Sequence, residues 1–160
     1  MERVKELPHA ARRLNIMGIC ASTPHCIQIY TDGSKIGGKV GAGAAIYVDQ
    51  VLKKQCKYKL QNCCSNNEAE QTVILKSLEE LTSLSDHNAR TAAIYTDSKV
   101  TLASLRKNFI HRPVIEEIGH NVRQLMTQNW SIHFGWVKAN TGIEGNKLAG
   151  NLAKAAEDMI

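Results

Sequence analysis

Residues 29–33, with the sequence IYTDG, are echoed at residues 94–98 by IYTDS. Each segment is rich in isoleucine, tyrosine and threonine and ends in an aspartate followed by a small residue, a pattern typical of a strand that stops at the edge of a sheet. The helical pattern between them, at residues 67–84, has the length of a crossover that joins neighbouring parallel strands. We therefore expect Asp32 and Asp97 to lie side by side at the carboxyl edge of the sheet, where open α/β sheets bind ligands.

The helical segment between the two aspartates supplies a third candidate carboxylate, Glu70. Ile74, Leu78 and Leu81 lie four, eight and eleven residues after it, so Glu70 continues the apolar face that points toward the sheet. The other acids of this segment fall off that face and are expected to be solvated helix charges; they are Glu68, Glu79 and Glu80.

Three carboxylates at one sheet edge indicate a divalent-metal site. Mutual repulsion and burial would raise their pKa values, and a divalent cation relieves both costs. Oxygen ligands suit Mg²⁺ or Mn²⁺ and not zinc, and two such ions about 3.5–4 Å apart can activate a water and stabilise the leaving oxygen of a phosphodiester. Taken singly, an aspartate before glycine is more often a turn former, and an inward glutamate is often paired with an arginine. The joint pattern favours the metal site.

The rest of the chain predicts strands first and then alternating strands and helices. The expected strands are 26–32, stopped by Gly33, then 43–48, 51–60, 92–97 and 130–137. The expected helices are 67–84 after an N-cap at Ser65, a short one through Leu105, one that starts at Pro113 with Val114, Ile118, Val122 and Leu125 on one face, and one near Thr141, where Thr141 and Glu144 form a capping box. This order implies a mixed sheet with helices packed on it. Residues 1–24 lack a sustained period and are expected to be an arm or linker.

The composition is that of one globular domain. The chain has 160 residues, 43% of them hydrophobic, which is enough for a single core. Its formal net charge of +5 suits a polyanionic partner, although many ordinary proteins are this basic. The five cysteines form no C-x-x-C pair, and the sequence shows neither a secretory leader nor an apolar run of roughly 20 residues that a membrane helix needs. We therefore expect reduced thiols, no membrane contact, and a location in the cytoplasm or nucleus.

The glycines at residues 33–38, followed by Lys39, come close to a phosphate-binding P-loop. Val40 stands where that motif requires a serine or threonine, and the pattern that follows at residues 41–48 is that of a strand and not of a helix. We therefore assign these glycines to a loop and a turn between strands, and reject nucleotide binding.

Four segments resemble the motifs of the ribonuclease H family in the family's order: residues 30–34, 65–70, 95–98 and 136–139. The resemblance implies a ribonuclease H-like α/β fold, a five-stranded mixed sheet with three antiparallel and then parallel strands, flanked by helices, in a domain at residues 25–158. It also implies endonucleolytic hydrolysis of the RNA strand of RNA/DNA hybrids, with Mg²⁺ as cofactor and Mn²⁺ as a substitute.

The resemblance also implies roles for individual residues. Asp32, Glu70 and Asp97 would be the catalytic metal ligands. Asn66 and Asn67 would lie near the hybrid backbone, where they could touch the 2′-hydroxyls that distinguish RNA from DNA. The full set of implied substrate contacts is Gly33, Ser34, Asn66, Asn67, Ser98 and Asn140.

Two positions depart from the family pattern. Asn140 replaces a loop histidine that is thought to help move water, protons or product, and Gly150 replaces a fourth aspartate that helps hold the second metal. Asparagine cannot shuttle protons near neutral pH, and glycine supplies no ligand. Lys147 also stands where relatives often carry glutamate. We therefore expect attenuated hydrolysis; the alternative is an inactive module that grips hybrid or supports a neighbouring reverse transcriptase.

Residues 142–146, with the sequence GIEGN, are similar to the ribonuclease H domains of non-LTR retrotransposon polyproteins. This similarity implies that the chain is part of a larger reverse transcriptase polyprotein. The implied partner is an RNA/DNA hybrid, and the isolated domain is expected to be a monomer.

Overall fold

A computed structural model of the chain describes residues 26–84, 90–106, 113–138 and 142–159. The strands are β1 (Cys26–Ile36), β2 (Lys39–Val48), β3 (Val51–Leu60), β4 (Thr91–Thr96) and β5 (Ser131–Trp136). The helices are α2 (Asn66–Thr82), α3 (Lys99–Arg106), α4 (Pro113–Thr127) and α5 (Glu144–Glu157). The expected arm at residues 1–24 and the expected substrate contact Asn140 lie outside the described residues.

The sheet has five strands in the order β3-β2-β1-β4-β5. β1, β2 and β3 pair antiparallel, whereas β4 pairs parallel with β1, and β5 pairs parallel with β4. Asp49 and Gln50, between the expected strands, join β2 to β3 with φ of 51° and 69°, and Gly37 and Gly38 join β1 to β2 with φ of 59° and 85°. The mixed sheet predicted from the sequence is therefore confirmed, and Gly37 and Gly38 form a turn and not a P-loop, whereas Gly33 lies within β1.

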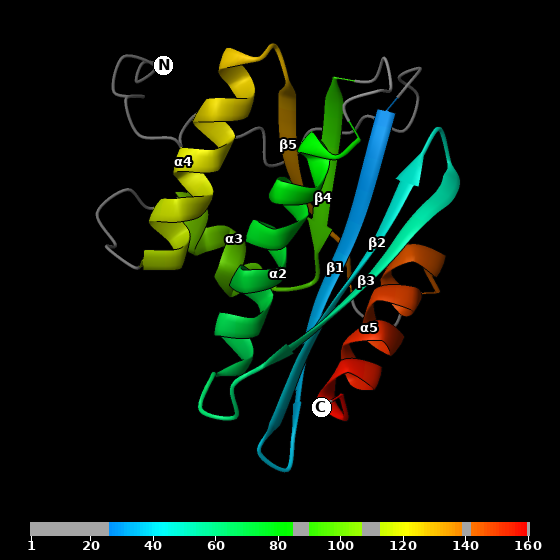
Figure 1. Ribbon diagram of the computed structural model, residues 1–160, viewed down its shortest axis with the longest axis vertical. Helices are drawn as coiled ribbons and strands as arrows, with labels where there is room; N and C mark the ends of the chain where they lie inside the picture. The colour runs from blue at the N-terminus through cyan, green and yellow to red at the C-terminus, as the bar shows by residue number, and fades with distance from the viewer. Residues whose placement is uncertain (1–25, 85–89, 107–112, 139–141, 160) are drawn as a thin grey trace.

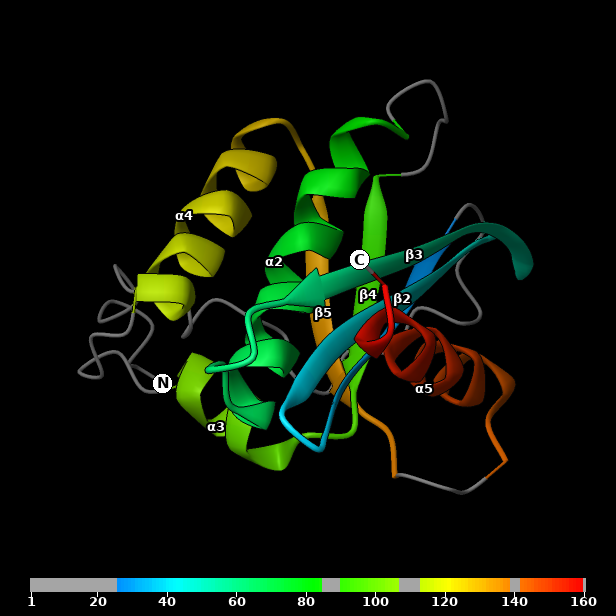
Figure 2. The ribbon, with the colours of Figure 1, turned by 60° about the horizontal axis from the view of Figure 1, so that its bottom comes forward.

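Helices cover both faces of this sheet (Figures 1 and 2). α2, α3 and α4 lie on one face, and α5 lies on the other, against β1, β2 and β3. The core under α2 and α4 includes fully buried side chains from strands and helices alike, among them Ile29, Ile46, Ile74, Ile94, Ile118 and Phe134. On α4 the buried residues are Ile115, Ile118, Val122 and Leu125, so Ile115 takes the buried place predicted for Val114, which is only partly buried.

β1 is longer than the sequence predicts. The expectation that Gly33 stops the first strand is wrong, because β1 continues beyond it in pairing with β2, which starts at Lys39 and not at Gly43. Gly33 has a different structural role: a Cβ at this position would lie 2.9 Å from the Ala69 Cβ and 3.0 Å from the Glu70 backbone nitrogen. The glycine thus lets the first turn of α2 approach the strand closely.

The two helices α2 and α5 begin differently. α2 has the predicted N-cap, Ser65, and a complete capping box, in which the Glu68 N–H donates to Ser65 Oγ at 3.0 Å and the Ser65 N–H donates to Glu68 Oε1 at 2.7 Å. The capping box predicted for α5 is wrong, because the N-cap is Ile143, without a side-chain hydrogen bond. Glu144 is the first helical residue and sits too early in the helix to act as the acid of a box with Thr141, which itself lies outside the described residues.

α5 approaches the sheet closely because β2 carries two glycines beneath it. A Cβ at Gly41 would lie 2.3 Å from the Ala153 carbonyl oxygen, and one at Gly43 would lie 2.6 Å from both the Ala149 carbonyl oxygen and the Ala153 nitrogen. Since these neighbours are backbone atoms, they could make room only if the helix moved. The glycines therefore set the distance between α5 and β2.

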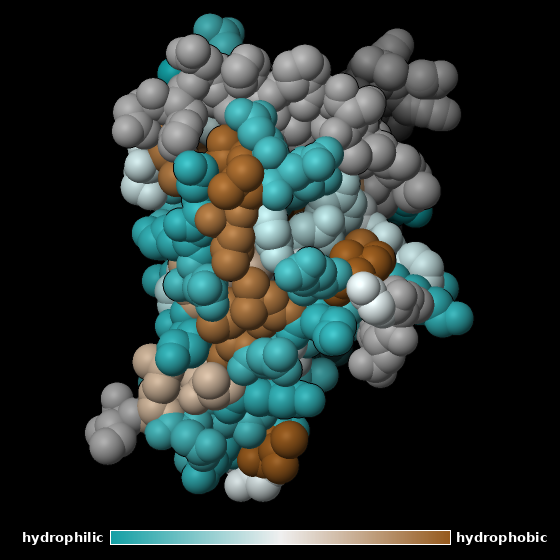
Figure 3. All heavy atoms as spheres, turned by 90° about the vertical axis from the view of Figure 1, so that its right-hand side faces the viewer, coloured by the Kyte–Doolittle hydropathy of each residue, from teal (hydrophilic) through white to brown (hydrophobic). Residues whose placement is uncertain are grey.

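The surface beside α5 is mostly polar, with one apolar strip (Figure 3). The sheet edge at β3 carries four lysines, Lys53, Lys54, Lys57 and Lys59, which protect an edge strand from pairing with other chains. Among the residues that the structure describes, no helix is both long and apolar enough to cross a membrane.

Gly43→Ala is expected to destabilise the fold by about 1–3 kcal/mol, because the added methyl group forces α5 away from β2. Urea denaturation followed by circular dichroism measures the loss. Ala155→Ser, which adds one heavy atom on an exposed position of α5, is the control and should change stability by less than about 0.5 kcal/mol. A Gly43→Ala chain as stable as the wild type would contradict this account of the helix contact.

Candidate metal centre

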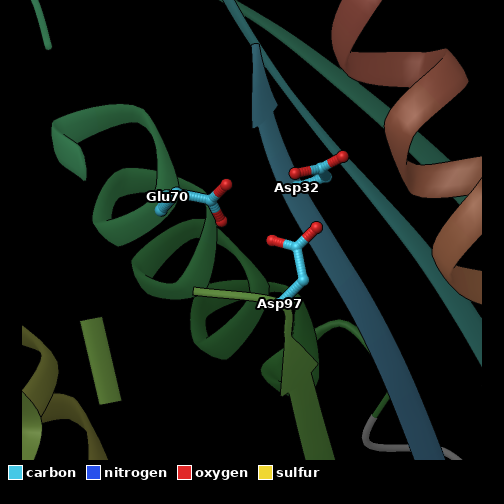
Figure 4. A group of neighbouring side chains, drawn as sticks. All are labelled: Asp32, Glu70 and Asp97. Atoms are coloured by element: carbon cyan, nitrogen blue, oxygen red, sulfur yellow. The ribbon is translucent and has the colours of Figure 1, made fainter. Parts of the chain in front are cut away.

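Three carboxylates from three separate elements meet at the end of β4. Asp32 lies on β1, Glu70 on α2 and Asp97 directly after β4, and Figure 4 shows their side chains pointing toward one another. One oxygen from each carboxylate lies within 4.8 Å of the other two. The structure thus brings together the three acids that the sequence singles out.

The register of the sheet explains how the two aspartates meet. β1 and β4 pair residue for residue through the echoed segments, ending at Tyr30 opposite Tyr95. The Thr31 hydroxyl donates to the Tyr95 carbonyl at 2.9 Å and closes this pairing. Beyond that point β4 ends while β1 continues with β2, so Asp32 and Asp97 flank the place where the two strands separate.

Glu70 is held at the site by hydrogen bonds to both of its carboxylate oxygens. The Gly33 N–H donates to Oε2 at 3.1 Å, and the Thr96 hydroxyl donates to Oε1 at 3.3 Å. The residue is only 4% exposed. Because the first turn of α2 lies against Gly33, the helix delivers this carboxylate directly onto the end of the sheet.

The peptide after β4 is also fixed. The Trp136 indole N–H donates to the Asp97 carbonyl at 3.2 Å, and the Lys99 ammonium lies 4.4 Å from the centre of the Trp136 ring. The Ser98 hydroxyl accepts from the Thr101 N–H at 3.1 Å and so caps the start of α3. These contacts fix the backbone on both sides of Asp97 and do not use its carboxylate, which remains available as a ligand.

Burial and crowding raise the pKa of all three acids. Burial, together with the charge of Asp32, raises the pKa of Glu70 to about 9. The same two causes raise the pKa of Asp97 to about 6. Burial also raises the pKa of Asp32, although hydrogen bonds from Glu70 and Gly33 and the positive charge of Lys154 act against it. The metal-free site therefore retains a proton at neutral pH.

The donor set fits a hard divalent ion. All three ligating groups are carboxylates, and their oxygens, within 4.8 Å of one another, need only a small inward shift to reach the distances around one ion. Such an ion would also remove the cost of crowding, since it binds the deprotonated form of each group. The acid triad can therefore bind a divalent metal.

The implied substrate contacts lie at different distances from this triad. Gly33 touches it through its N–H, whereas the Ser34 hydroxyl donates to the carboxylate of Glu157 on α5. Asn66 and Asn67 are exposed in the first turn of α2. Ser98 is occupied as the cap of α3, and Asn140 lies outside the described residues.

A cleft of about 210 Å³ opens beside the triad, between the end of β1 and α5. It is lined by two of the three acids and by one face of the helix: Asp32, Asp97, Asn146, Lys147, Gly150, Asn151 and Lys154. A Cβ at Gly150 would lie 3.0 Å from Asp32 Oδ2, so residue 150 is the point of α5 that faces the triad.

The helix residues that line this cleft share no motif in the sequence. Lys147 stands out only as a departure from the family pattern, and no sequence pattern gives Asn146, Asn151 or Lys154 a role. Their spacing is compatible with one helix face, but only the packing of α5 on β2 shows that this face looks toward Asp32.

The stability of the metal-free chain is expected to fall as pH rises from about 4.5 toward about 9, the ordinary and the raised pKa of Glu70. In this window the folded chain keeps a proton that the unfolded chain releases, so the free energy of unfolding decreases with pH. Mg²⁺ should restore stability more at high pH than at low pH.

Urea denaturation across this pH range, with and without Mg²⁺, measures the effect. Glu70→Gln should flatten the profile, whereas Glu79→Gln, on the exposed side of α2, should leave it unchanged. A profile that rises with pH in the metal-free protein would show that Glu70 is ionised without metal.

Known proteins share this fold and sequence pattern. The chain is 32% identical to a ribonuclease H of Chromohalobacter salexigens over 148 residues, which cover 84% of this chain and 85% of that protein. It is 31% identical to a ribonuclease H of Tropheryma whipplei over 138 residues, which cover 79% of this chain and 81% of that protein.

Solved structures are similar as well. The N-terminal RNase H domain of a Mycobacterium tuberculosis protein superposes with a TM-score of 0.65 at 24% identity, covering 83% of this chain and 94% of that one. RNase H1 of Halobacterium salinarum superposes with a TM-score of 0.63 at 19% identity, covering 83% and 98%. The sequence profile of the RNase H family matches residues 24–158. With its mixed sheet, its acid triad and this match over most of its length, the chain belongs to the ribonuclease H family and is an enzyme of that type.

Proposed function

We propose that this chain cleaves the RNA strand of RNA/DNA hybrids internally, by divalent-metal hydrolysis at Asp32, Glu70 and Asp97. Mg²⁺ is the proposed cofactor, and Mn²⁺ can replace it. The observation that carries the proposal is the meeting of three carboxylates from separate elements within 4.8 Å of one another. Three carboxylates that crowd together at the end of a sheet, one of them buried and the other two half-buried, repel one another and have no evident structural benefit.

The carboxylates would position the metal and the reacting water. A divalent ion at the triad would polarise the phosphodiester and make a water more acidic. In hydrolysis the water oxygen attacks phosphorus, the bond from phosphorus to the leaving ribose oxygen breaks, and that oxygen takes up a proton. Glu70 is best placed to orient the centre, because the Gly33 N–H and the Thr96 hydroxyl fix its two oxygens.

The exposed start of α2 is the proposed contact with the hybrid backbone. Asn66 and Asn67 lie there without burial, about one helical turn before Glu70. Their amides can both donate and accept, which suits a 2′-hydroxyl and so the distinction of RNA from DNA. Gly33, Ser34, Ser98 and Asn140 complete the proposed set of substrate contacts, with Ser34 and Ser98 acting mainly through the backbone because their hydroxyls are engaged.

Two departures from the family pattern favour attenuated hydrolysis over full activity. Gly150 faces Asp32 and offers no ligand, and Asn140 cannot carry protons as the family histidine does. The same observation supports the second candidate function, a module that binds hybrid without turnover. We favour the enzyme because the three acids nearest the proposed metal are all present and converge.

The proposed context is a reverse transcriptase polyprotein of a non-LTR retrotransposon, as the sequence of residues 142–146 suggests. In it, residues 25–158 would form the ribonuclease H domain and residues 1–24 a connecting arm. The isolated domain would be a monomer acting in the cytoplasm or nucleus. Light scattering tests the oligomeric state, and sequencing of the genomic locus tests the polyprotein.

Asp32→Asn is expected to reduce cleavage of a labelled RNA/DNA hybrid in Mg²⁺ by at least roughly 100-fold, since even outer contacts of metal ligands are worth 10–100-fold. Glu79→Gln, an acid on the exposed face of α2, is the matched control and should cleave as the wild type does. Equal, background-level cleavage by the wild type and Asp32→Asn in both Mg²⁺ and Mn²⁺ would favour the non-catalytic module.

The double variant Asn140→His, Gly150→Asp should cleave faster than the wild type if the two departures attenuate the enzyme. The aspartate would place a fourth carboxylate beside Asp32, and the histidine would supply a group that titrates near neutral pH. Initial rates at saturating Mg²⁺ measure the gain. No gain in either metal, with the fold intact by circular dichroism, would show that attenuation has another source.

A further inference from the structure

One face of α5 carries two lysines opposite the acids of the cleft. Lys147, Gly150 and Lys154 recur at intervals of three and four residues, so they share one side of the helix, and all three line the cleft beside Asp32. Figure 4 shows α5 passing beyond Asp32, across the site from Glu70. The cleft therefore has carboxylates on one side and ammonium groups on the other.

The two lysines are available to a ligand. Both are exposed, and among the residues that the structure describes neither has an ion-pair partner. Gly150, between them along the helix face, puts no side chain between Asp32 and the cleft. A negatively charged group entering the cleft would thus meet both the lysines and a metal held by the triad.

Asn146 adds an independent sign of a ligand. The residue is 7% exposed and lines the same cleft, yet its Oδ1 has no hydrogen-bond partner within the described parts of the chain. A buried oxygen without a donor is unfavourable, and because Asn146 lines the cleft, a ligand bound there is the expected source of that donor. A sugar hydroxyl supplies such a donor, whereas a phosphate oxygen alone does not. The cleft therefore suits a sugar phosphate.

Charge counting disfavours a second divalent ion here. When all three acids are ionised, their three negative charges and the two positive charges of Lys147 and Lys154 give the cleft a net charge of minus one. One divalent ion turns this into plus one, which a phosphodiester neutralises, and a second ion would turn it into plus three. The residues of α5 that line the cleft also include no carboxylate that could bind a second ion, so Asp32 and Asp97 are the only acids among the described residues that line the cleft.

We propose that the cleft between the triad and α5 binds a phosphodiester of the nucleic acid strand through Lys147 and Lys154. These lysines take the place of a second divalent ion, so that the metal centre holds a single divalent ion. The proposal rests on the proposed function and names the electrostatic partner of its substrate. In this arrangement Lys147 and Lys154 neutralise the phosphate, and Asn146 accepts a hydrogen bond from the neighbouring sugar.

Counting bound Mn²⁺ tests the number of ions. Electron paramagnetic resonance of the full chain, with and without an RNA/DNA hybrid that keeps its 2′-hydroxyls, in samples frozen directly after mixing, reports free Mn²⁺ and any spin-coupled pair; a gel verifies that the hybrid stays intact. One Mn²⁺ per chain without a coupled signal is expected. Gly150→Asp, which adds a carboxylate beside Asp32, is the comparison variant and should bind more Mn²⁺. Two coupled ions in the wild type would overturn the proposal.

Hybrid affinity in Ca²⁺ tests the lysines without requiring turnover. Lys147→Met, Lys154→Met should weaken binding about tenfold and lower the slope of log affinity against log salt by about two, because each lysine that neutralises a phosphate adds roughly one to that slope. The matched double arginine variant should retain both the affinity and the slope. Lys53→Met, which removes an exposed charge on β3, should have less than half this effect.

A double methionine variant that binds with the wild-type slope, or no more weakly than Lys53→Met, would overturn the phosphate-binding role. That outcome leaves the proposed function standing, because it concerns only α5. If the wild type neither binds hybrid nor cleaves it above the level of Asp32→Asn, the proposed function itself fails.

Discussion

Three carboxylates held within 4.8 Å of one another in a half-buried corner repel each other, and the surrounding fold has to keep them there. The raised pKa of Glu70, about 9, records the cost in the absence of metal. Part of that cost is offset by donors, the Gly33 N–H and the Thr96 hydroxyl, which satisfy the glutamate oxygens. The rest is what a divalent ion would relieve, so the free energy stored in the crowded acids becomes affinity for the metal.

Close backbone approaches make this corner rigid. Gly33 lets the first turn of α2 touch β1, and Gly41 and Gly43 let α5 lie directly on β2. Both helices are thereby positioned by backbone contact on opposite faces of the same antiparallel strands (Figure 2). The acid from α2 and the lysines from α5 face one another across the end of β1 because of these glycines, which carry no chemistry themselves.

The two sides of the site are therefore unlike in charge, and this difference governs the chemistry. On the α2 side, the buried Glu70 and the two half-buried aspartates attract a cation into a place where its field is less screened than in water. On the α5 side, Lys147 and Lys154 present flexible positive charges at the solvent boundary, where a polyanionic strand arrives. A phosphodiester lying between the two would be neutralised from both directions, with Asp32 between the metal and the helix.

Much of this was predictable from local pattern. The echoed segments at residues 29–33 and 94–98 determined which strands pair and that Asp32 and Asp97 meet, because strand register carries equivalent residues to equivalent positions. The apolar period after Glu70 determined which helix acid turns inward. The end of β1 was predicted wrongly, because a glycine at residue 33 is a local stop signal only when no partner strand extends past it.

What lies opposite the acids was decided by tertiary structure alone. Lys147, Gly150 and Lys154 form one helix face in any α-helix, but sequence does not state which way that face is turned. Its direction follows from the fit of Ala149 and Ala153 onto Gly41 and Gly43, a contact between segments far apart in the chain. The sequence by itself thus determined the sheet and its three acids, which depend on local periodicity, whereas packing across the sheet decided that these acids face the two lysines of α5.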